Sequence, residues 1–323
     1  MRRPFDSLTL RGRARRLRPL AVAALAAYAL DDVRLRLLSN TWNCVFRVDS
    51  RQGRFVLRIC LPGHGHRPEL VQSEAAFLAA LAADSDIEVL RPIPTRDGRL
   101  VVRAGAPDVP EERMCVLFSW VPGRMLAKDI TPATFEQHGA LHARLHHFAA
   151  AWTPPPQFAI RDFTHTLHFP DDVVVWDAEL FGHSALFREA HAASDALIAR
   201  VRARDAVIVT HGDLHQGNVL VHRGVLRPID FEEVMWATRV QDVATSLYYV
   251  SARPNRVALQ DAFRRGYERI APWVEGEPGE IERLLFARAL VLLNFLAVEP
   301  AFRSRDWSVT VERAARLARI VVA

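Results

Sequence analysis

The sequence HGDLHQGNVLVHRGVLRPIDFEE, residues 211–233, combines closely spaced polar residues with the pattern of a tight hairpin. Between Asn218 and Asp230, two short runs rich in Val and Leu flank an Arg-Gly pair, which is typical of two strands joined by a turn. A hairpin brings its two ends together, so we expect Asn218 and Asp230 to lie side by side. Asp213 belongs to the loop that leads into the first strand and is expected next to them.

These three side chains supply oxygen atoms of the kind that Mg²⁺ prefers. Two carboxylates and one amide oxygen leave coordination positions for phosphate and water, which is how proteins commonly bind Mg²⁺. The alternation of His211, Asp213 and His215 also fits a metallohydrolase, but such a site would leave Asn218 and Asp230 unexplained. The spacing therefore favours a site for magnesium and phosphate.

The region before this motif is predicted to be rich in strands. Residues 37–60 contain two β-rich runs around a polar turn at 50–53, which predicts an antiparallel hairpin. A helix that opens with proline is expected over 68–83. Further strands are expected at 87–95, 99–104 and 114–120. Together these elements indicate an α+β arrangement.

After VPGRM, residues 121–125, the predicted elements are mainly helical. Periodic apolar residues indicate helices at 133–152, 185–204, 240–250, 257–270, 280–297 and 311–322. We therefore divide the chain into a basic N-terminal arm at 1–19, a first lobe at 20–118 and a second lobe at 119–323.

Composition limits the possible phosphate-binding chemistry. Of the 42 basic residues 41 are arginine, and Lys128 is the single lysine. No Walker A loop surrounds Lys128, and the glycine-rich string GHGHRP from Gly63 has a proline where a dinucleotide-binding loop needs its third glycine. The sequence therefore argues against a Walker A protein, a dinucleotide-binding fold and Schiff-base chemistry.

The basic character of the chain is confined to its start. The formal net charge is +5, but residues 1–18 contain seven of the arginines and one aspartate. The rest of the chain carries 35 basic and 36 acidic residues, which is a net charge of −1. A protein that binds nucleic acid through its fold needs a basic face on the fold itself. We therefore expect no nucleic-acid partner.

The apolar run LAVAALAAYAL, residues 20–30, is interpreted as an amphipathic first helix. Leu20, Ala24, Ala27 and Tyr28 recur at helical spacing, and no clean cleavage site for a secretion signal follows. The run is too short to span a membrane. Three cysteines, each in an apolar run, fit reduced core thiols. We expect a cytoplasmic protein with no membrane partner.

The motifs HGDLHQGNVL and PIDFEE resemble the aminoglycoside phosphotransferase family, which shares its fold with protein kinases, choline kinases, type II homoserine kinases and stress response kinase A. The spacing of Asp213 and Asn218 is that of the HRDxxxxN catalytic loop. Weaker similarities are LLSNTWNCVFRV, SEAAFLAALA, LFSWVPGR, ALHARLHH and VQDVA. The resemblance implies an α+β, bilobal protein-kinase-like fold with a small β-rich N-lobe and a larger, mainly helical C-lobe.

The resemblance also implies roles for the motif residues. Asp213 would be the catalytic aspartate that accepts or orients the proton of a substrate hydroxyl. Asn218 and Asp230 would bind Mg²⁺ at the phosphates of ATP. Asp242 is expected to bond the backbone of the catalytic loop, and His211 to hold the same loop by hydrogen bonds.

Other nucleotide-binding positions follow from the same resemblance. Glu74 matches the glutamate that pairs with a cation on the third strand, where this chain has Arg58 in place of the usual lysine. Arginine keeps the charge and can bond two oxygens at once. Ser39 and Asn40 lie in the nucleotide-loop position, which has no glycine. Ser119 and Val121 lie in the Phe118–Gly123 hinge and are also expected at the nucleotide.

The resemblance implies transfer of the γ-phosphoryl group of ATP to a hydroxyl of a small molecule. A protein Ser/Thr kinase of the stress response kinase A type and a nucleotide-binding regulator without catalysis are the alternatives. The chain is expected to be a monomer or a homodimer.

Two further groups of residues have competing interpretations. Residues such as Trp176, Asp177 and Glu179 could line a pocket for a cationic substrate or be plain surface and core. The helix with His138, His142, His146 and His147 offers a possible zinc pair, but ordinary helix histidines are favoured.

Overall fold

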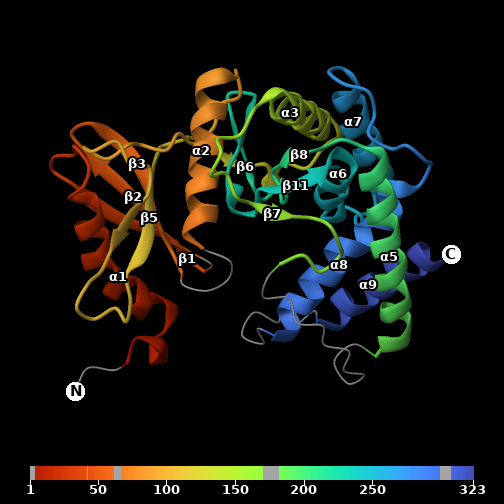
Figure 1. Cartoon of the computed structure of the whole chain (residues 1–323), viewed down its shortest axis with the longest axis horizontal. Helices are drawn as coiled ribbons and strands as arrows, with labels where there is room; N and C mark the ends of the chain where they lie inside the picture. Colours follow the sequence, from red (N-terminus) through yellow and green to blue (C-terminus); the bar gives the residue numbers. More distant parts are fainter. Residues whose placement is uncertain (1–3, 42, 62–66, 170–181, 299–306) are drawn as a thin grey trace. The chain divides into compact units, whose positions relative to one another are not determined.

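The computed structural model describes residues 4–41, 43–61, 67–169, 182–298 and 307–323. The chain divides into two compact units (Figure 1). The first unit comprises Met1–Pro122 with Pro154–Ala159, and the second comprises Gly123–Thr153 with Ile160–Ala323. Among the described helices, none is both long and apolar enough to cross a membrane.

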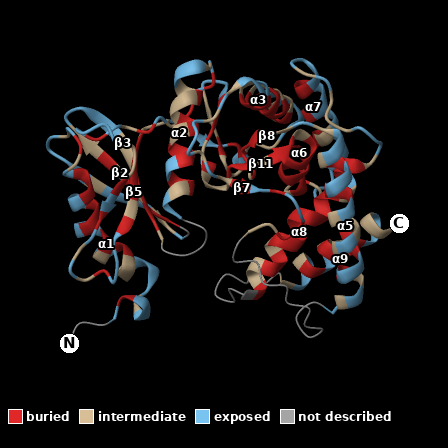
Figure 2. Ribbon diagram, viewed as in Figure 1, coloured by how far each residue is buried: buried red, intermediate tan, exposed pale blue. Residues whose placement is uncertain are grey.

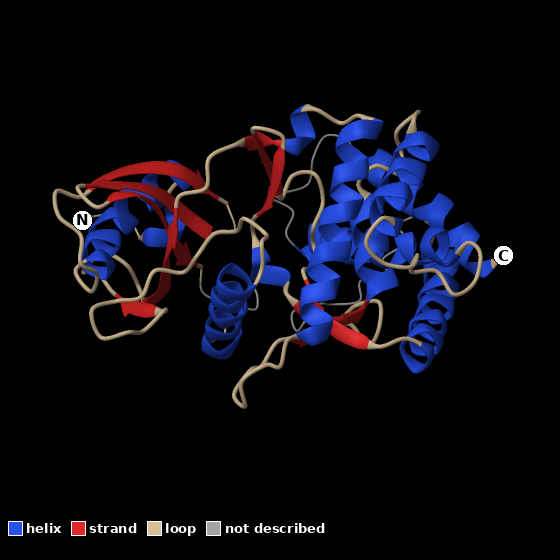
Figure 3. Cartoon of the chain, turned by 90° about the horizontal axis from the view of Figure 1, so that it is seen from above, coloured by secondary structure: helices blue, strands red, loops and turns tan. Residues whose placement is uncertain are grey.

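The first unit is built on a five-stranded antiparallel sheet with the strand order β1-β2-β3-β5-β4 (Figure 3). The strands are β1 (Arg34–Asn40), β2 (Asn43–Ser50), β3 (Gly53–Cys60), β4 (Val102–Ala104) and β5 (Arg113–Ser119). The predicted hairpin is confirmed in β2 and β3, which pair from Asn43 with Cys60 to Ser50 with Gly53.

Helix α1 (Leu10–Leu25), which follows the short 3-10 helix η1 (Phe5–Ser7), covers one face of this sheet. It begins well before the expected start at residue 20, because Thr9 caps it and accepts a hydrogen bond from Gly12 N–H. Buried Ala14 and Leu17 continue the apolar stripe toward the N-terminus. The first arginines therefore belong to a packed helix as well as to a basic segment.

Helix α2 (Pro68–Asp84) begins at the predicted proline. The strand expected at 87–95 was wrong, since only Pro92 forms an isolated bridge, with Phe118. Pro92 and Pro94 have no N–H to donate, so this segment cannot pair continuously with β5.

The second unit is mainly helical, as the sequence predicted. Its helices are α3 (Pro132–Ala151), α5 (Ser184–Arg204), α6 (Arg239–Tyr248), α7 (Arg256–Glu268), α8 (Glu280–Val298) and α9 (Trp307–Val322). Its 3-10 helices are η2 (Leu126–Lys128) and η3 (Phe231–Glu233). Its strands are β6 (Arg124–Met125), β7 (Arg161–Asp162), β8 (Val207–Thr210), β9 (Val219–His222), β10 (Val225–Pro228) and β11 (Met235–Thr238). They form the sheets β10-β9-β6 and β7-β11-β8.

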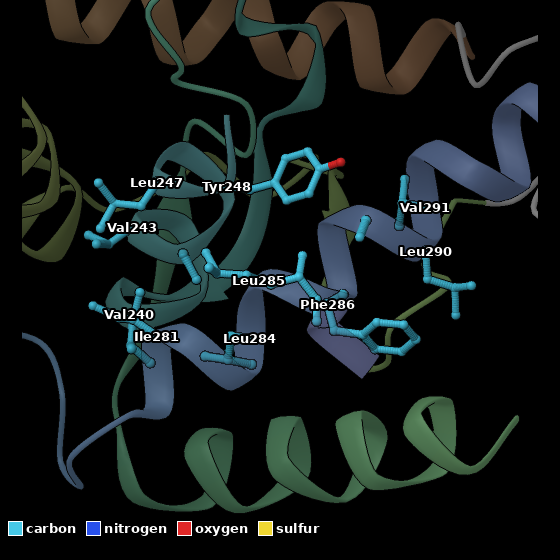
Figure 4. Packing of buried hydrophobic residues seen from close by; sticks show 14 of the residues in the cluster. Val240, Val243, Leu247, Tyr248, Ile281, Leu284, Leu285, Phe286, Leu290 and Val291 are labelled. Atoms are coloured by element: carbon cyan, nitrogen blue, oxygen red, sulfur yellow. The ribbon is translucent and has the colours of Figure 1, made fainter. Parts of the chain in front are cut away.

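The core of this unit lies where α6 and α8 face each other over α5. Val240 and Leu247 of α6 pack in the same cluster as Ile281 and Leu285 of α8 (Figure 4). Most residues of both helices are buried (Figure 2). This packing positions α6 and α8 so that side chains of both helices reach the loop between β8 and β9.

Candidate active site

The loop 211–218 joins β8 to β9 and is held by hydrogen bonds within its own backbone. His215 N–H donates to Asp213 O at 2.8 Å, and Asn218 N–H donates to His215 O at 2.8 Å. These two bonds form successive turns, so the side chains of Asp213 and Asn218 come to the same side of the loop. Ser246 of α6 adds a bond from its hydroxyl to Leu214 O at 2.7 Å.

Gly212 and His211 set the path of the chain before Asp213. Gly212 has a φ of +78°, and a Cβ atom there would lie 2.2 Å from Glu233 O, so only glycine fits this close approach. The ring of His211 accepts from Asp213 N–H at 3.3 Å and donates from Nε2 to Ile229 O at 3.1 Å. Burial lowers the pKa of His211, so the neutral ring makes these bonds. The predicted role of His211 in holding the loop is confirmed.

The hairpin predicted between Asn218 and Asp230 is present. Strands β9 and β10 pair in antiparallel register around a turn at Arg223 and Gly224, which have φ values of +51° and +78°. At the open end, Ile229 N–H donates to Asn218 O at 2.9 Å. Asn218 therefore lies opposite Ile229, and Asp230 is the next residue along the chain.

Asp230 has an unusual backbone conformation. Its φ and ψ are 66° and 64°, in the left-handed region that residues other than glycine rarely adopt. Such a conformation costs about 1–3 kcal/mol and is concentrated at functional sites. The next residue, Phe231, is buried with its ring 4.3 Å from that of His211, which ties the strained residue to the loop 211–218. Asp230 itself is exposed at the end of the hairpin.

The amide of Asn218 has a defined orientation. Its Nδ2 donates to the backbone oxygen and to Oδ2 of Asp213, both at 3.0 Å. The carbonyl end of the amide therefore remains as an oxygen ligand, which fits a hard cation such as Mg²⁺. No group of three or more His, Cys, Asp or Glu side chains in the described residues could hold a metal alone. A cation here would thus need Asn218 and the oxygens of a phosphate.

The second oxygen of Asp213 contacts residues that the sequence did not single out. Oδ1 accepts a bond from Tyr249 OH at 3.0 Å and from Arg288 Nη2 at 2.6 Å. Burial raises the pKa of Asp213, and the Arg288 guanidinium opposes this rise. The ring of His215 stacks on Tyr249 with centroids 3.9 Å apart, and burial lowers the pKa of His215 to about 3. Glu233 pairs with the same guanidinium at 2.9 Å.

Only a weak signal in the sequence could have identified Arg288 and Tyr249. Arg288 is the one charged residue within the run LLFARALVLL of residues 284–293, and a lone charge in an apolar helix needs a buried partner. Tyr249 lies in a Tyr-Tyr pair at the end of α6 and had no distinguishing feature.

Asp242 supports the loop 211–218 from α6, as expected. Its Oδ1 accepts from Gly212 N–H at 2.8 Å, and its Oδ2 is 2.9 Å from Nε2 of His146. The other ring nitrogen of His146 bonds Tyr267 OH at 2.9 Å. Burial by itself would raise the pKa of Asp242, but the bond from His146 and the electrostatic effects of His146, His142 and His211 together lower it to about 2. A buried anion thus fixes the backbone just before Asp213.

Three of the four histidines of α3 are core residues. His138, His142 and His146 are buried one turn apart, and successive ring centroids are 4.8 Å and 6.0 Å apart. His146 belongs to the Asp242 network, whereas His138 lies edge-on to Phe263. Burial and ring contacts thus account for His138 and His142, and the bond to Asp242 accounts for His146, as the ordinary interpretation of helix histidines expects.

We expect these buried histidines to make the protein sensitive to acid. Burial lowers the pKa of His138 well below its usual value and that of His142 to about 4. Below pH 6.5 the unfolded chain binds protons that the native chain does not, so stability falls as the pH drops from about 6.5 toward 4. Each such histidine should lower the free energy of unfolding at pH 5 by roughly 2 kcal/mol. Urea unfolding at pH 7.5 and pH 5 measures this loss.

A matched pair of substitutions tests the origin of the acid sensitivity. His138→Phe keeps an aromatic ring beside Phe263 and should reduce the loss of stability between pH 7.5 and pH 5. His147→Phe, at an exposed position of the same helix, should leave the loss unchanged. If the two variants and the wild type lose the same stability, His138 is not responsible.

The pair predicted in the first unit is confirmed. Arg58 follows Leu57 in β3, which faces α1, so alternation turns Arg58 to the opposite face of the sheet. There its two terminal nitrogens bond the two carboxylate oxygens of Glu74 on α2 at 2.8 Å and 2.5 Å. Both side chains are buried, and the guanidinium lies 5.3 Å from the Phe118 ring. This bidentate geometry holds the guanidinium of Arg58 against α2 through both carboxylate oxygens of Glu74.

The other nucleotide-binding candidates also lie in the first unit. Ser39 and Asn40 end β1, where Ser39 bonds Thr41 at 3.4 Å and the Asn40 amide donates to Leu10 O at 2.6 Å. Asn40 therefore ties the strand end to the start of α1. Ser119 ends β5, and its hydroxyl accepts from Arg91 N–H at 3.0 Å. Val121 is half-buried after this strand.

Residues 170–181 lie outside the described part of the chain. They include Trp176, Asp177 and Glu179, the residues that the sequence indicated for a substrate pocket. Three free cysteines, Cys44, Cys60 and Cys115, are buried in the first unit, as expected for core thiols.

Solved structures provide the most extensive similarities. The microcompartment-associated aminopropanol kinase is 25% identical, covers 94% of this chain and 95% of its own, and has a TM-score of 0.74. The amicoumacin kinase hAmiN, solved with AMP-PNP and Ca²⁺, is 18% identical with a TM-score of 0.75, and the match covers 97% of this chain and 96% of its own. Spectinomycin phosphotransferase APH(9)-Ia is 15% identical over 94% of this chain and 97% of its own, with a TM-score of 0.57.

Sequence comparison identifies the family. The uncharacterised protein sll1119 of Synechocystis sp. is 26% identical over 259 residues, and the match covers 74% of this chain but only 66% of the relative. The model of the group described as "Phosphotransferase enzyme family" matches residues 34–279, which include the hairpin motif, Arg58 and Glu74. The chain belongs to this phosphotransferase family and has its α+β, kinase-like fold.

Proposed function

We propose that the protein transfers the γ-phosphoryl group of ATP to a hydroxyl of a small molecule, with Mg²⁺ as the metal. The observation that carries this proposal is the bonding of Asn218 to Asp213 at the open end of the hairpin that leads to Asp230. This arrangement supports the proposal because in-line phosphoryl transfer uses a carboxylate beside oxygen ligands for a cation.

Each candidate residue then has a chemical role. Asp213 orients the acceptor hydroxyl and takes its proton as the oxygen–phosphorus bond forms and the bond to the ADP oxygen breaks. Asn218 and Asp230 hold Mg²⁺, which neutralises phosphate charge when bound. In the first unit, Arg58, positioned by Glu74, contacts the ATP phosphates. The resemblance adds Ser39, Asn40, Ser119 and Val121 as further nucleotide contacts.

The similar proteins suggest acceptors to test first. The structure most similar in sequence among those described above is an aminopropanol kinase, and hAmiN is an amicoumacin kinase. We propose a small alcohol that carries an amino group as the acceptor class. A panel of 1-amino-2-propanol, amicoumacin, spectinomycin, homoserine, choline and a Ser/Thr peptide includes both this class and the protein-kinase alternative.

Consumption of ATP by the purified protein with Mg²⁺ tests the proposal. Phosphorylation of an amino alcohol or a related hydroxyl compound, detected by mass spectrometry, would support it. Phosphorylation of the peptide alone would favour a protein Ser/Thr kinase. Nucleotide binding without turnover on any acceptor would favour a regulator that has lost catalysis.

Replacement of Asp230 tests the proposed metal site directly. Asp230→Asn keeps the shape of the side chain but removes a charged oxygen ligand. Mg²⁺-dependent binding of AMP-PNP should therefore weaken by at least roughly 10- to 100-fold, which is the loss caused by mutating residues that only support metal ligands. Calorimetric titration with and without Mg²⁺ measures this change.

Asp261→Asn, at an exposed carboxylate on α7, is the matched control and should bind as the wild type does. Equal affinity of the Asp230→Asn variant and the wild type in the presence of Mg²⁺ would exclude Asp230 as a metal ligand.

A further inference from the structure

Arg288 is a buried cation on an apolar helix. Its side chain is 6% exposed, and the flanking residues Phe286, Ala287, Ala289 and Leu290 of α8 belong to the hydrophobic core. Burial of a guanidinium costs several kcal/mol unless its donors are satisfied by charged or polar partners. A buried arginine at this position is therefore stable only if charged or polar groups bind its guanidinium.

All three guanidinium nitrogens of Arg288 have partners. Nη1 donates to Glu233 Oε2 at 2.9 Å, and Nη2 donates to Asp213 Oδ1 at 2.6 Å. Nε and Nη2 also lie 3.1 Å and 2.8 Å from Tyr249 OH. Arg288 thus connects the loop after β8 to η3, the 3-10 helix that follows the candidate metal ligand Asp230.

The two oxygens of Asp213 differ in how fully they are occupied. Oδ1 accepts from both Arg288 and Tyr249, which uses its two lone pairs. Among the hydrogen bonds of the described residues, Oδ2 accepts only the one from Asn218, and Nε2 of His215 lies 3.7 Å away. One lone pair of Oδ2 therefore remains for a further donor.

We propose that Arg288, together with Tyr249, is a positioning residue that holds Oδ1 of Asp213 and presents Oδ2 to the acceptor hydroxyl. This inference rests on the proposed function. Arg288 touches neither acceptor nor nucleotide in this role, and it acts through Asp213. Its bond to Glu233 sets the distance between the catalytic carboxylate and the segment that carries Asp230.

Lysine could not take this position. An ammonium group is one point charge, whereas the planar guanidinium reaches Glu233, Asp213 and Tyr249 in three directions at once. A misplacement of a catalytic group by about 1 Å can cost roughly 10²-fold in rate. Arg288→Lys should therefore behave nearly as Arg288→Gln does.

The kinetic test uses Arg288→Gln, Arg288→Lys and Tyr249→Phe in the full chain, assayed with the best acceptor of the panel above and by the slow hydrolysis of Mg·ATP. We expect kcat to fall roughly 10- to 100-fold for both Arg288 variants and several-fold for Tyr249→Phe. The affinity for Mg·AMP-PNP should stay within about threefold of wild type, since Asp230 and Asn218 are unchanged. Arg283→Gln, on the same helix with its partner Glu277 at 3.7 Å, is the matched control.

A double-mutant cycle separates positioning from general support of the fold. If Arg288 acts through Asp213, Arg288→Gln should change kcat by less than about threefold in an Asp213→Asn background. Additive losses in kcat, or a parallel loss of Mg·AMP-PNP affinity, would overturn the inference. Tyr249→Phe removes one hydroxyl and keeps the stacked ring, so it tests the same contact if the Arg288 variants do not fold.

The outcome for wild type separates this inference from the proposed function. An inactive wild-type protein that transfers phosphate to no acceptor and hydrolyses no Mg·ATP would refute the proposed function itself. An active wild type with Arg288 and Tyr249 variants of normal kcat would leave the function in place and refute only the role of Arg288.

Discussion

Replacement of Asp213 with asparagine is expected to lower the rate of phosphoryl transfer about 10²- to 10⁴-fold, which is the usual contribution of a positioned base. The substitution keeps the size of the side chain but removes its negative charge and the oxygen that takes the proton. Asn218 and Asp230 remain in place, so affinity for Mg·AMP-PNP should change less than about threefold. Steady-state kinetics with the phosphorylated product quantified by mass spectrometry gives the result.

Asp205→Asn provides the control for this experiment. Asp205 also carries a carboxylate near β8, but it pairs with Arg204 at the end of α5. The control should retain wild-type turnover. Wild-type turnover by Asp213→Asn would rule out Asp213 as the catalytic aspartate. If the variant loses both turnover and nucleotide binding, the substitution has damaged the fold.

Replacement of Gly266 with alanine is expected to destabilise the protein by about 3 kcal/mol and to lower Tm by roughly 10 °C. Gly266 of α7 packs against α3 so closely that a Cβ atom would lie 1.7 Å from Glu136 O. Gly139 of α3 makes the reciprocal approach, with a Cβ position 1.9 Å from Phe263 O. Glycine thus lets the two helices cross at backbone contact, and an added methyl group must push them apart.

The sign of this result distinguishes packing from helix propensity. In an exposed helix, a change from glycine to alanine is stabilising by about 1 kcal/mol. Gly105→Ala is the control, because its Cβ would meet only Glu112 Cγ at an ordinary 3.5 Å. Thermal unfolding of both variants gives the comparison, and a Gly266→Ala protein as stable as wild type would show that α3 and α7 can separate at little cost. Since α3 carries His146 to the Asp242 network, separation should also reduce turnover.

Local spacing carried most of the information about the fold and the site. The turn at Arg223 and Gly224 defines a hairpin, and a hairpin has one geometry at its open end, so the approach of Asn218 to Ile229 followed from the ten residues between them. The pairing of Arg58 with Glu74 came from family resemblance, and alternation in β3 explains why the side chain faces α2. Such features depend on residues that are close in sequence or that share one face of a sheet, so the spacing of residue types in the sequence predicts them.

Boundaries and irregular segments were less predictable. Helix α1 began earlier than its apolar run because a threonine cap and the stems of arginine residues favour a helix, whatever their charge. The apolar residues of segment 87–95 suggested a strand, but its two prolines lack the N–H groups needed for continuous hydrogen bonding to a neighbouring strand.

The amino-acid sequence by itself determined the mixed fold class, the hairpin between Asn218 and Asp230 and the residue types that can bind Mg²⁺ and phosphate, because these rest on short-range periodicity and fixed spacing. Only the tertiary structure decided which side chains hold Asp213 in place. Arg288 lies 75 residues away from Asp213, on a helix whose neighbouring residues look like ordinary core. Its role arises from the packing of α8 against α6, which brings a buried charge to a carboxylate at long range, and no local pattern encodes that contact.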